Sequence, residues 1–155
     1  MWENLGGTVI FKGKCFIGND SFLSFGHTTL VEFGDKFVNQ AAMKLVSGKG
    51  IQFGNDVTLG WACMIMDTNF HPLYDMVNKR MKPASGKIVI GSDNWFGADC
   101  KIMPSVVTPD HCTFGLGTIV TRGGEKKSYC VMAGSPMKII TENVKRHSDY
   151  RTEKY

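Results

Sequence analysis

Apolar residues recur at every sixth position through most of the chain. Three blocks contain thirteen such positions, and twelve are apolar although 43% of all residues are hydrophobic. The period differs from the 3.6-residue repeat of a helix and from strict strand alternation. It predicts short, regularly spaced strands. The thirteen positions are Leu5, Phe11, Ile17, Leu23, Phe53, Leu59, Ile65, Ile90, Phe96, Ile102, Thr108, Phe114 and Val120.

The remaining hexad positions agree with a strand followed by a turn. Glycine often follows the large apolar residue, as at Gly54, Gly60 and Gly97, and a small residue stands four places after it. One hexad cannot bury its apolar side chain, whereas stacked coils form a continuous core. We therefore predict one all-β solenoid domain over 1–155. Its coils cover 1–140, and 141–155 form a short charged helix or a frayed C-terminal cap.

Two stretches interrupt this period. Within 29–52 the pattern restarts out of phase at Phe33-Gly34, and residues 72–87, PLYDMVNKRMKPASGK, match no hexad. Irregular segments of about 15 residues inside a compact domain are usually functional. We expect the second stretch to leave the solenoid as a basic excursion loop.

The composition suits one ordered domain. The chain has 155 residues, and its 18 glycines and 5 prolines fall short of the level typical of disorder. There is no run of 18 apolar residues that could span a membrane. Because the N-terminus also lacks the basic and apolar regions of a signal peptide, we expect a cytoplasmic protein.

Charge is unevenly distributed. The formal net charge is +4; residues 1–78 hold five basic and seven acidic groups, and residues 79–155 hold thirteen and seven. A basic half can attract phosphorylated ligands, including nucleic acid. No RNA-binding motif or recognition helix accompanies it, so we expect no nucleic-acid partner and an ordinary solvated surface.

The five cysteines do not form a ligand set. Neither a CxxC pair nor a Cys/His cluster is present, which predicts no metal site. Four of them stand at the small hexad position and are expected to fill a narrow core, while the role of Cys130 stays open. Those four are Cys15, Cys63, Cys100 and Cys112.

Four stretches together resemble the hexapeptide-repeat acyltransferases, in particular the galactoside, maltose and capsular polysaccharide O-acetyltransferases. They are MDTNFHP at 66–72, IGSDNWFGADCKI at 90–102, FGLGTIVTR at 114–122 and AGSPMKII at 133–140. The resemblance covers nearly the whole chain and implies a left-handed parallel β-helix. It also implies a homotrimer with active sites between subunits. The implied reaction moves an acetyl group from acetyl-CoA to a hydroxyl of a sugar or glycan precursor, without a metal.

The sequence departs from the family pattern around the cofactor groove. Thr108-Pro109 replaces an aliphatic-glycine pair, and GLGT puts Leu116 where a small residue is usual. GGEKKS at 123–128 replaces a proline-rich turn, and Met137 replaces alanine or cysteine. These differences concern the shape of the groove rather than the fold.

Acyl transfer to a hydroxyl needs a base, and a neutral histidine suits this role near neutral pH. We expect His27 to lie inward, His111 in a surface turn and His147 in the tail. His71 ends a repeat block at the mouth of the excursion loop. Position alone leaves a structural role open, but the resemblance of DTNFHP to the catalytic segment of the family implies that His71 is the general base.

The resemblance implies further site residues. Asp67 or Asn69 would orient the His71 ring, and Asn39 and Gln40 would contact the acceptor. Both substrates would bind together and react directly, without a cysteine-linked intermediate. The cofactor would lie between subunits along the later coils, at Trp95, Ala98, Leu116, Thr121, Arg122 and Lys138.

Three alternatives remain. The chain could transfer acetyl groups to the nitrogen of an amino sugar, or it could be a non-catalytic solenoid with no cofactor affinity. A γ-carbonic-anhydrase-like protein has the same type of coil, but its zinc site needs three histidines, two of them closely spaced. Histidines at 27, 71, 111 and 147 argue against that arrangement.

Overall fold

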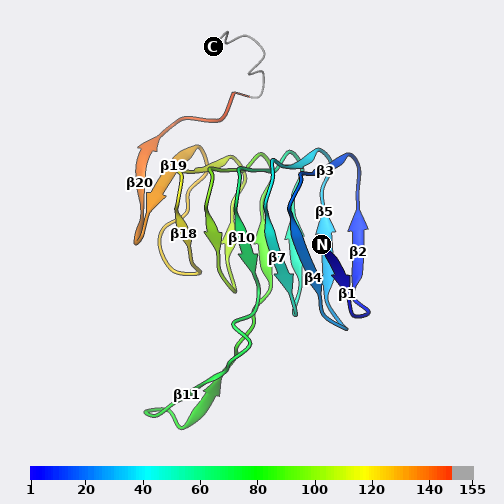
Figure 1. Ribbon diagram of the computed structural model, residues 1–155. Coiled ribbons are helices and arrows are strands. Elements are labelled where there is room, and N and C mark those ends of the chain that lie inside the picture. Colours follow the sequence, from blue (N-terminus) through cyan, green and yellow to red (C-terminus); the bar gives the residue numbers. More distant parts are fainter. Residues whose placement is uncertain (148–155) are drawn as a thin grey trace.

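The computed structural model describes residues 1–147. They form a solenoid of about six coils with three faces, each a sheet of mainly parallel strands (Figure 1). Face A contains β1 (Trp2–Asn4), β4 (Phe22–Phe25), β7 (Lys44–Ser47), β10 (Met64–Met66), β15 (Lys101–Ile102) and β18 (Ile119–Val120). Face B contains β2 (Thr8–Phe11), β5 (Leu30–Phe33), β8 (Ile51–Phe53), β13 (Ile88–Ile90) and β16 (Val107–Thr108). Face C contains β3 (Cys15–Ile17), β6 (Phe37–Asn39), β9 (Thr58–Leu59), β14 (Trp95–Phe96), β17 (Cys112–Phe114), β19 (Cys130–Gly134) and β20 (Met137–Glu142).

The chain visits faces A, B and C in turn, and equivalent side chains stack inside the prism. Phe33 and Phe53, for example, occupy adjacent coils of face B and stack with their ring centroids 5.3 Å apart. Ten of the thirteen predicted hexad positions are buried. Ile17 is half-buried, and Phe11 is 47% exposed because the first coil has no coil beyond it. The all-β solenoid prediction is confirmed.

All departures from the six-residue spacing fall at one edge of the prism. From face B to face C and from face C to face A, stacked inward positions are six residues apart in the first five coils. From face A to face B, the first three coils contain additional residues, and this explains the phase slip within 29–52. We call the turns that join face A to face B, at residues 5–7, 26–29, 48–50, 67–87 and 103–106, the A–B edge.

Two sequence expectations fail at this edge because its turns vary in length. Leu5 was expected to point inward, but Trp2 takes the inward place beside Leu23, and Leu5 lies in the turn with half of its surface exposed. His27 was also expected to point inward and is exposed in the 26–29 turn.

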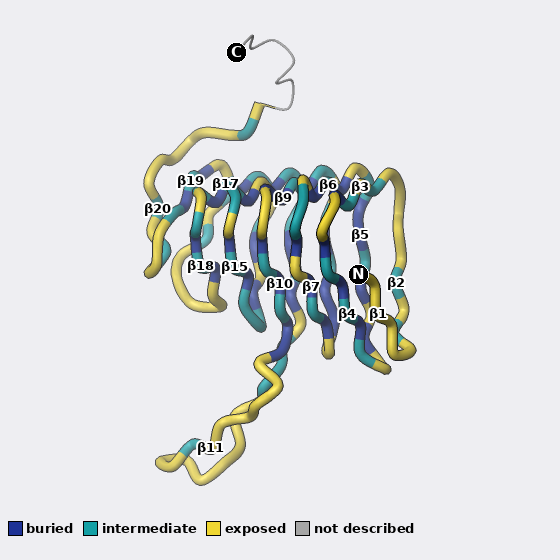
Figure 2. Tube along the Cα trace, in the orientation of Figure 1, coloured by how far each residue is buried: buried dark blue, intermediate teal, exposed yellow. Residues whose placement is uncertain are grey.

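The excursion leaves the fourth coil between β10 and β13. Its strands β11 (Leu73–Asp75) and β12 (Arg80–Lys82) pair antiparallel, and a bridge joins Thr68 to Ser85. Residues 68–86, which we call the arm, project away from the prism and are mostly exposed (Figures 1 and 2). The arm therefore begins about four residues before the predicted excursion at 72–87, and His71 lies within it instead of ending a repeat block.

The two ends of the solenoid differ. At the C-terminal end β20 turns back antiparallel onto β19, and residues 143–147 follow without a helix. The rest of the predicted cap, 148–155, lies outside the described residues. At the N-terminal end β1, β2 and β3 each form the outer strand of their sheet. None of the residues from 1 to 147 form a helix that is long and apolar enough to cross a membrane.

Candidate functional site

His71 is exposed at the base of the arm and held there by its backbone. Its N–H donates to the Asn69 carbonyl, 2.7 Å away, across a tight turn in which Phe70 has a φ of 61°. The Thr68 hydroxyl accepts a bond from the Phe70 N–H at 3.0 Å, and the Asn69 N–H donates to Ala84 on the opposite side of the arm. A positive φ at a bulky residue is unfavourable, so this turn is fixed by its surroundings.

Asp67 anchors the arm to the preceding coil. Its carboxylate is fully buried and accepts bonds from the Ser47 hydroxyl at 2.7 Å and from the backbone N–H groups of Gly48, Lys49 and Gly50 at 2.7, 2.9 and 2.6 Å. The Asp67 carbonyl accepts from the N–H of residue 86, where the chain returns from the arm. A buried carboxylate with four donors is well satisfied.

No hydrogen bond to the His71 imidazole is found within residues 1–147. The Asp67 carboxylate is instead bonded to the 47–50 turn, and Asn69 contacts His71 only through a backbone hydrogen bond. The predicted orientation of the ring by either side chain stays a prediction. What the structure shows is an accessible imidazole on a firmly anchored turn.

The edge between faces C and A carries the next group of predicted residues. Ala98 and Leu116 occupy equivalent corners of adjacent coils, and the Gly117 N–H donates to the Ala98 carbonyl. Leu116 is 77% exposed, and Trp95 projects outward from face C just before this corner. Trp61 stands one coil earlier at the same corner, is 63% exposed, and was missed. Its place directly after Gly60, like Ala98 after Gly97, could have revealed it.

The last coil and β20 carry the remaining predicted cofactor residues. A hollow of about 360 Å³ is bordered by Thr121 on one side and by the Ser135-Pro136-Met137 turn on the other. Arg122 and Lys138 are exposed and each is next in sequence to a lining residue. Positive groups beside such a hollow are suited to phosphates.

One predicted acceptor contact is wrong. Asn39 is fully buried inside the prism, where its amide donates to the Ser21 hydroxyl at 3.0 Å, so it does not face a ligand. The alternation of β6 turns its side chain inward. Gln40, the next residue, is exposed at the turn, and its role stays a prediction.

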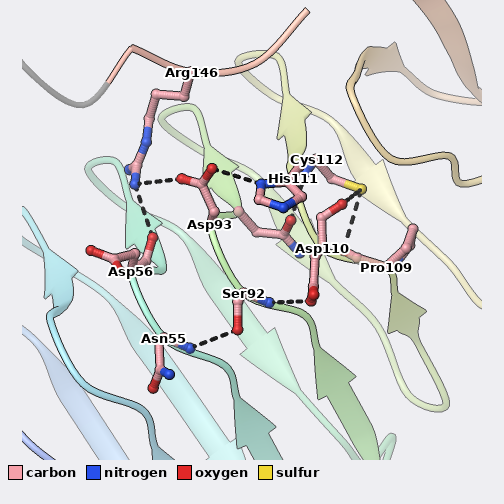
Figure 3. Close-up of polar contacts among 10 residues, drawn as sticks. Asn55, Asp56, Ser92, Asp93, Pro109, Asp110, His111, Cys112 and Arg146 are labelled. Atoms are coloured by element: carbon pink, nitrogen blue, oxygen red, sulfur yellow. Dashed lines mark hydrogen bonds and ion pairs between the residues drawn. The ribbon is translucent and has the colours of Figure 1, made fainter. Parts of the chain in front are cut away.

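The edge between faces B and C, which we call the B–C edge, holds a separate polar cluster (Figure 3). His111 Nδ1 lies 2.8 Å from Asp93 Oδ2, and the His111 ring stacks on Tyr129 with centroids 4.6 Å apart. Arg146 reaches back from the C-terminal segment to Asp93 at 3.3 Å and to the carbonyl of Asp56 at 2.9 Å. His111 is therefore part of a cluster that holds Arg146, in the segment after β20, against the B–C edge.

The four cysteines at the small hexad position pack in or against the core, as expected. All five are free, four are buried, and Cys130 joins the core next to Cys112. Burial raises the pKa of Cys15 to about 11 and that of Cys112 to about 12. Both thiols are therefore protonated near neutral pH and are poor nucleophiles.

One chain keeps its two groups of predicted site residues apart. Face A strands run from the C–A corner to the A–B edge: Leu116 precedes β18, whereas Asp67 and His71 follow β10. The imidazole and the Ala98–Leu116 corner thus lie at opposite ends of these strands.

Sequence comparisons find curated sugar O-acetyltransferases that are similar to this chain. The galactoside O-acetyltransferase of Lactococcus lactis is 30% identical over 70% of this chain and 52% of its own length. The chain is a relative of the hexapeptide-repeat O-acetyltransferases. The polysialic acid O-acetyltransferase of Escherichia coli is also 30% identical, over 63% of this chain and 34% of its own. The chain therefore spans about half, or less, of these relatives. No protein family model matches the sequence.

Solved structures show the same fold. The polySia-specific acetyltransferase NeuO superposes with a TM-score of 0.73 at 20% identity, covering 98% of this chain and 78% of that one. A galactoside acetyltransferase in complex with coenzyme A gives 0.62 at 22% identity, covering 93% and 74%. The predicted fold class, a left-handed parallel β-helix, is confirmed.

Proposed function

We propose that the protein transfers an acetyl group from acetyl-CoA to a hydroxyl of a sugar or glycan precursor, with His71 as general base. The observation that carries the proposal is the exposed imidazole at the anchored root of the arm, in a chain related to O-acetyltransferases. Because acetyl-CoA is a cytoplasmic metabolite, the proposal keeps the predicted cytoplasmic location.

The proposed reaction is a direct transfer between two bound substrates. His71 accepts the proton of the acceptor hydroxyl as its oxygen attacks the thioester carbonyl. The tetrahedral intermediate then collapses, the carbon–sulfur bond breaks, and the proton passes to the departing thiolate of CoA. Holding both substrates in place contributes much of the acceleration. The high pKa values of the Cys15 and Cys112 thiols support a route without a cysteine-bound acetyl group.

Acetyl-CoA would lie along the C–A corner and the last coil. The small Ala98 between Trp61 and Leu116 leaves space for a slender chain, and the hollow beside Thr121 is large enough for part of the cofactor. Arg122 and Lys138 would contact its phosphates. The exposed Leu116 narrows this path compared with a smaller side chain.

A homotrimer would bring the two halves of the site together. Since His71 and the C–A corner lie at opposite ends of the face A strands, the arm of one subunit would place His71 beside the corner of its neighbour. Cyclic packing repeats this contact three times. The exposed Trp61, Trp95 and Leu116 would then be covered.

The test is release of free CoA thiol from acetyl-CoA across a panel of neutral sugars, acidic glycans, nucleotide-sugars and amino sugars. We expect acceptor-dependent release with at least one hydroxyl acceptor, and mass spectrometry of the product should show an O-linked acetyl group. An N-linked product would replace the proposal with transfer to an amino sugar. The absence of release with every acceptor would refute it.

A further inference from the structure

Large apolar side chains gather at the free end of the arm, in residues 74–81, which we call the tip. Tyr74 and Met81 oppose each other on one face of the hairpin, and both are more than half exposed. In the turn between the strands Met76 is 79% exposed, and Val77, at 88%, is the most exposed large hydrophobic residue among residues 1–147. Single exposed apolar residues are ordinary, whereas four within eight positions mark a contact surface.

The carboxylate of Asp75 holds the turn at the tip in one shape. It accepts bonds from the backbone N–H groups of Val77 and Asn78, at 3.0 and 2.9 Å, and from the Asn78 amide at 3.0 Å. These bonds, those from Asn78 first, hold the pKa of Asp75 below its usual range. Met76 and Val77 therefore stand exposed on an ordered support.

The hairpin that carries the tip is positively charged. Residues 73–82 contain three basic groups, Lys79, Arg80 and Lys82, against one acidic group, which leaves a formal net charge of +2. Arg80 stands opposite Asp75, and Lys82 lies 3.5 Å from the same carboxylate, so these two cations share one counter-charge. Among residues 1–147, no carboxylate lies within ion-pair distance of Lys79.

We infer that the tip of the arm binds the surface of a membrane that contains anionic lipids. The apolar side chains of the turn enter the boundary between headgroups and acyl chains. The long basic side chains beside them stay at the level of the headgroups and contact lipid phosphates. The inference concerns the tip alone and leaves the root of the arm, with His71, to the proposed active site. It does not depend on the proposed reaction.

Two features favour a bilayer over a protein partner. The arm carries its tip well clear of the prism, so a flat surface can touch the tip without touching the coils (Figures 1 and 2). The tip is also small, because each side of a stable protein interface contributes roughly 20–30 residues. A bilayer needs only a short apolar insertion beside basic groups, and the net positive charge of the hairpin complements anionic headgroups.

The experiment measures sedimentation of the full chain with lipid vesicles, without acetyl-CoA or acceptor. One set of vesicles consists of phosphatidylcholine alone, and the other contains equal parts of phosphatidylcholine and phosphatidylglycerol. We expect binding to the anionic vesicles, about ten-fold weaker binding to the neutral ones, and a loss of binding as NaCl is added.

The apolar variant pair is Met76→Ser with Val77→Ser. Its matched control is Val107→Ser with Ile140→Ser, which removes two exposed apolar side chains from the prism. The tip pair should weaken binding to anionic vesicles about ten-fold, and Lys79→Gln should weaken it about five-fold. The control should match the wild type, and circular dichroism checks that every variant is folded.

The outcomes keep this inference separate from the proposed function. Equal binding to neutral and anionic vesicles, or equal binding by the tip and control pairs, would overturn the inference. A change in oligomeric mass of the tip pair, measured by light scattering, would also overturn it, because the tip would then contact a second copy of the chain. With a soluble acceptor the tip pair should release CoA thiol at the wild-type rate. Vesicle binding without thiol release from any acceptor would refute the proposed function alone.

Discussion

The A–B edge and the B–C edge of the prism differ in the length and regularity of their turns. At the B–C edge, side chains of each coil cap the backbone of the coil before it: Asp35, Asn55, Ser92 and Asp110 accept bonds from backbone N–H groups at 2.6–3.1 Å. Figure 3 shows the bonds to Ser92 and Asp110. The spacing there stays at six residues in the first five coils. At the A–B edge the turns differ in length, and one of them extends into the arm.

The difference teaches where this fold can accept new function. A continuous ladder of caps at one edge keeps the coils in register, so the opposite edge can be lengthened without moving the core. At the A–B edge the side-chain bonds follow another pattern: Thr29 is linked to Ser47 and Ser47 to Asp67, and Asp67 also holds the 48–50 turn. The candidate base His71 stands directly beyond Asp67.

The largest contrast should come from inserting a Gly-Ser dipeptide into the second coil. Between His27 and Thr28, at the A–B edge, the insertion should cost less than about 1 kcal/mol of unfolding free energy, because a longer surface turn loses little loop entropy. The same insertion between Asp35 and Lys36, at the B–C edge, should break the caps and shift β6 out of register. We expect that variant not to fold. Thermal unfolding followed by circular dichroism measures both, and equal tolerance would contradict the comparison.

Removing the imidazole at the arm should affect activity without affecting the fold. We expect His71→Ala to lower kcat for acetyl transfer about 1,000-fold, the size typical of a lost general base. His27→Ala is the matched control, because His27 is also exposed at the A–B edge. Steady-state kinetics with acetyl-CoA would argue against the assignment if both variants behaved alike.

The two edges should also differ in the energy carried by one carboxylate. Asp67→Asn leaves buried donors facing an amide and should lower the unfolding free energy by about 3 kcal/mol. Asp110→Asn, an exposed position with one backbone bond at 2.6 Å, should cost about 1 kcal/mol or less. Denaturant titration gives both values. Similar losses would mean that Asp67 does not anchor the arm.

The smallest effect concerns the C-terminal segment on the B–C edge. Arg146→Ala removes the contacts to Asp93 and Asp56 and should cost about 1 kcal/mol, while Lys145→Ala, an exposed neighbour, should be neutral. The same titration applies. A neutral Arg146 variant would show that this segment adds nothing to the rigidity of the edge.

The periodicity of the sequence predicted the core because each coil must bury one large side chain per face. It did not predict the turn lengths at the A–B edge, since an apolar repeat places strands but does not count the residues between them. Leu5 and His27 were misplaced for this reason. Asn39 was misplaced for a different reason. An asparagine is usually a turn residue, but here its side chain lies inside the prism and bonds to Ser21.

Less of the candidate site could be predicted from the residues alone. The DTNFHP stretch led to His71 through its family resemblance, while the burial of Asp67 depends on contacts with a turn about 20 residues earlier. Trp61 was overlooked although it follows a hexad glycine, as Ala98 and Leu116 do, and the stacked coils place it at the same corner. In the proposed trimer these groups would meet across two subunits, a contact that the sequence of one chain does not display.

The spacing between paired strands has a consequence for biogenesis. Parallel partners lie 18–22 residues apart along the chain, except in the three strand pairs that span the arm, where Ile51 pairs with Ile88, Thr58 with Trp95 and Met64 with Lys101. During synthesis each new coil can therefore dock on the one completed just before it, with short loops to close. The fourth coil can be completed only after the arm has emerged from the ribosome. We therefore expect the longest delay between the docking of successive strands to occur there.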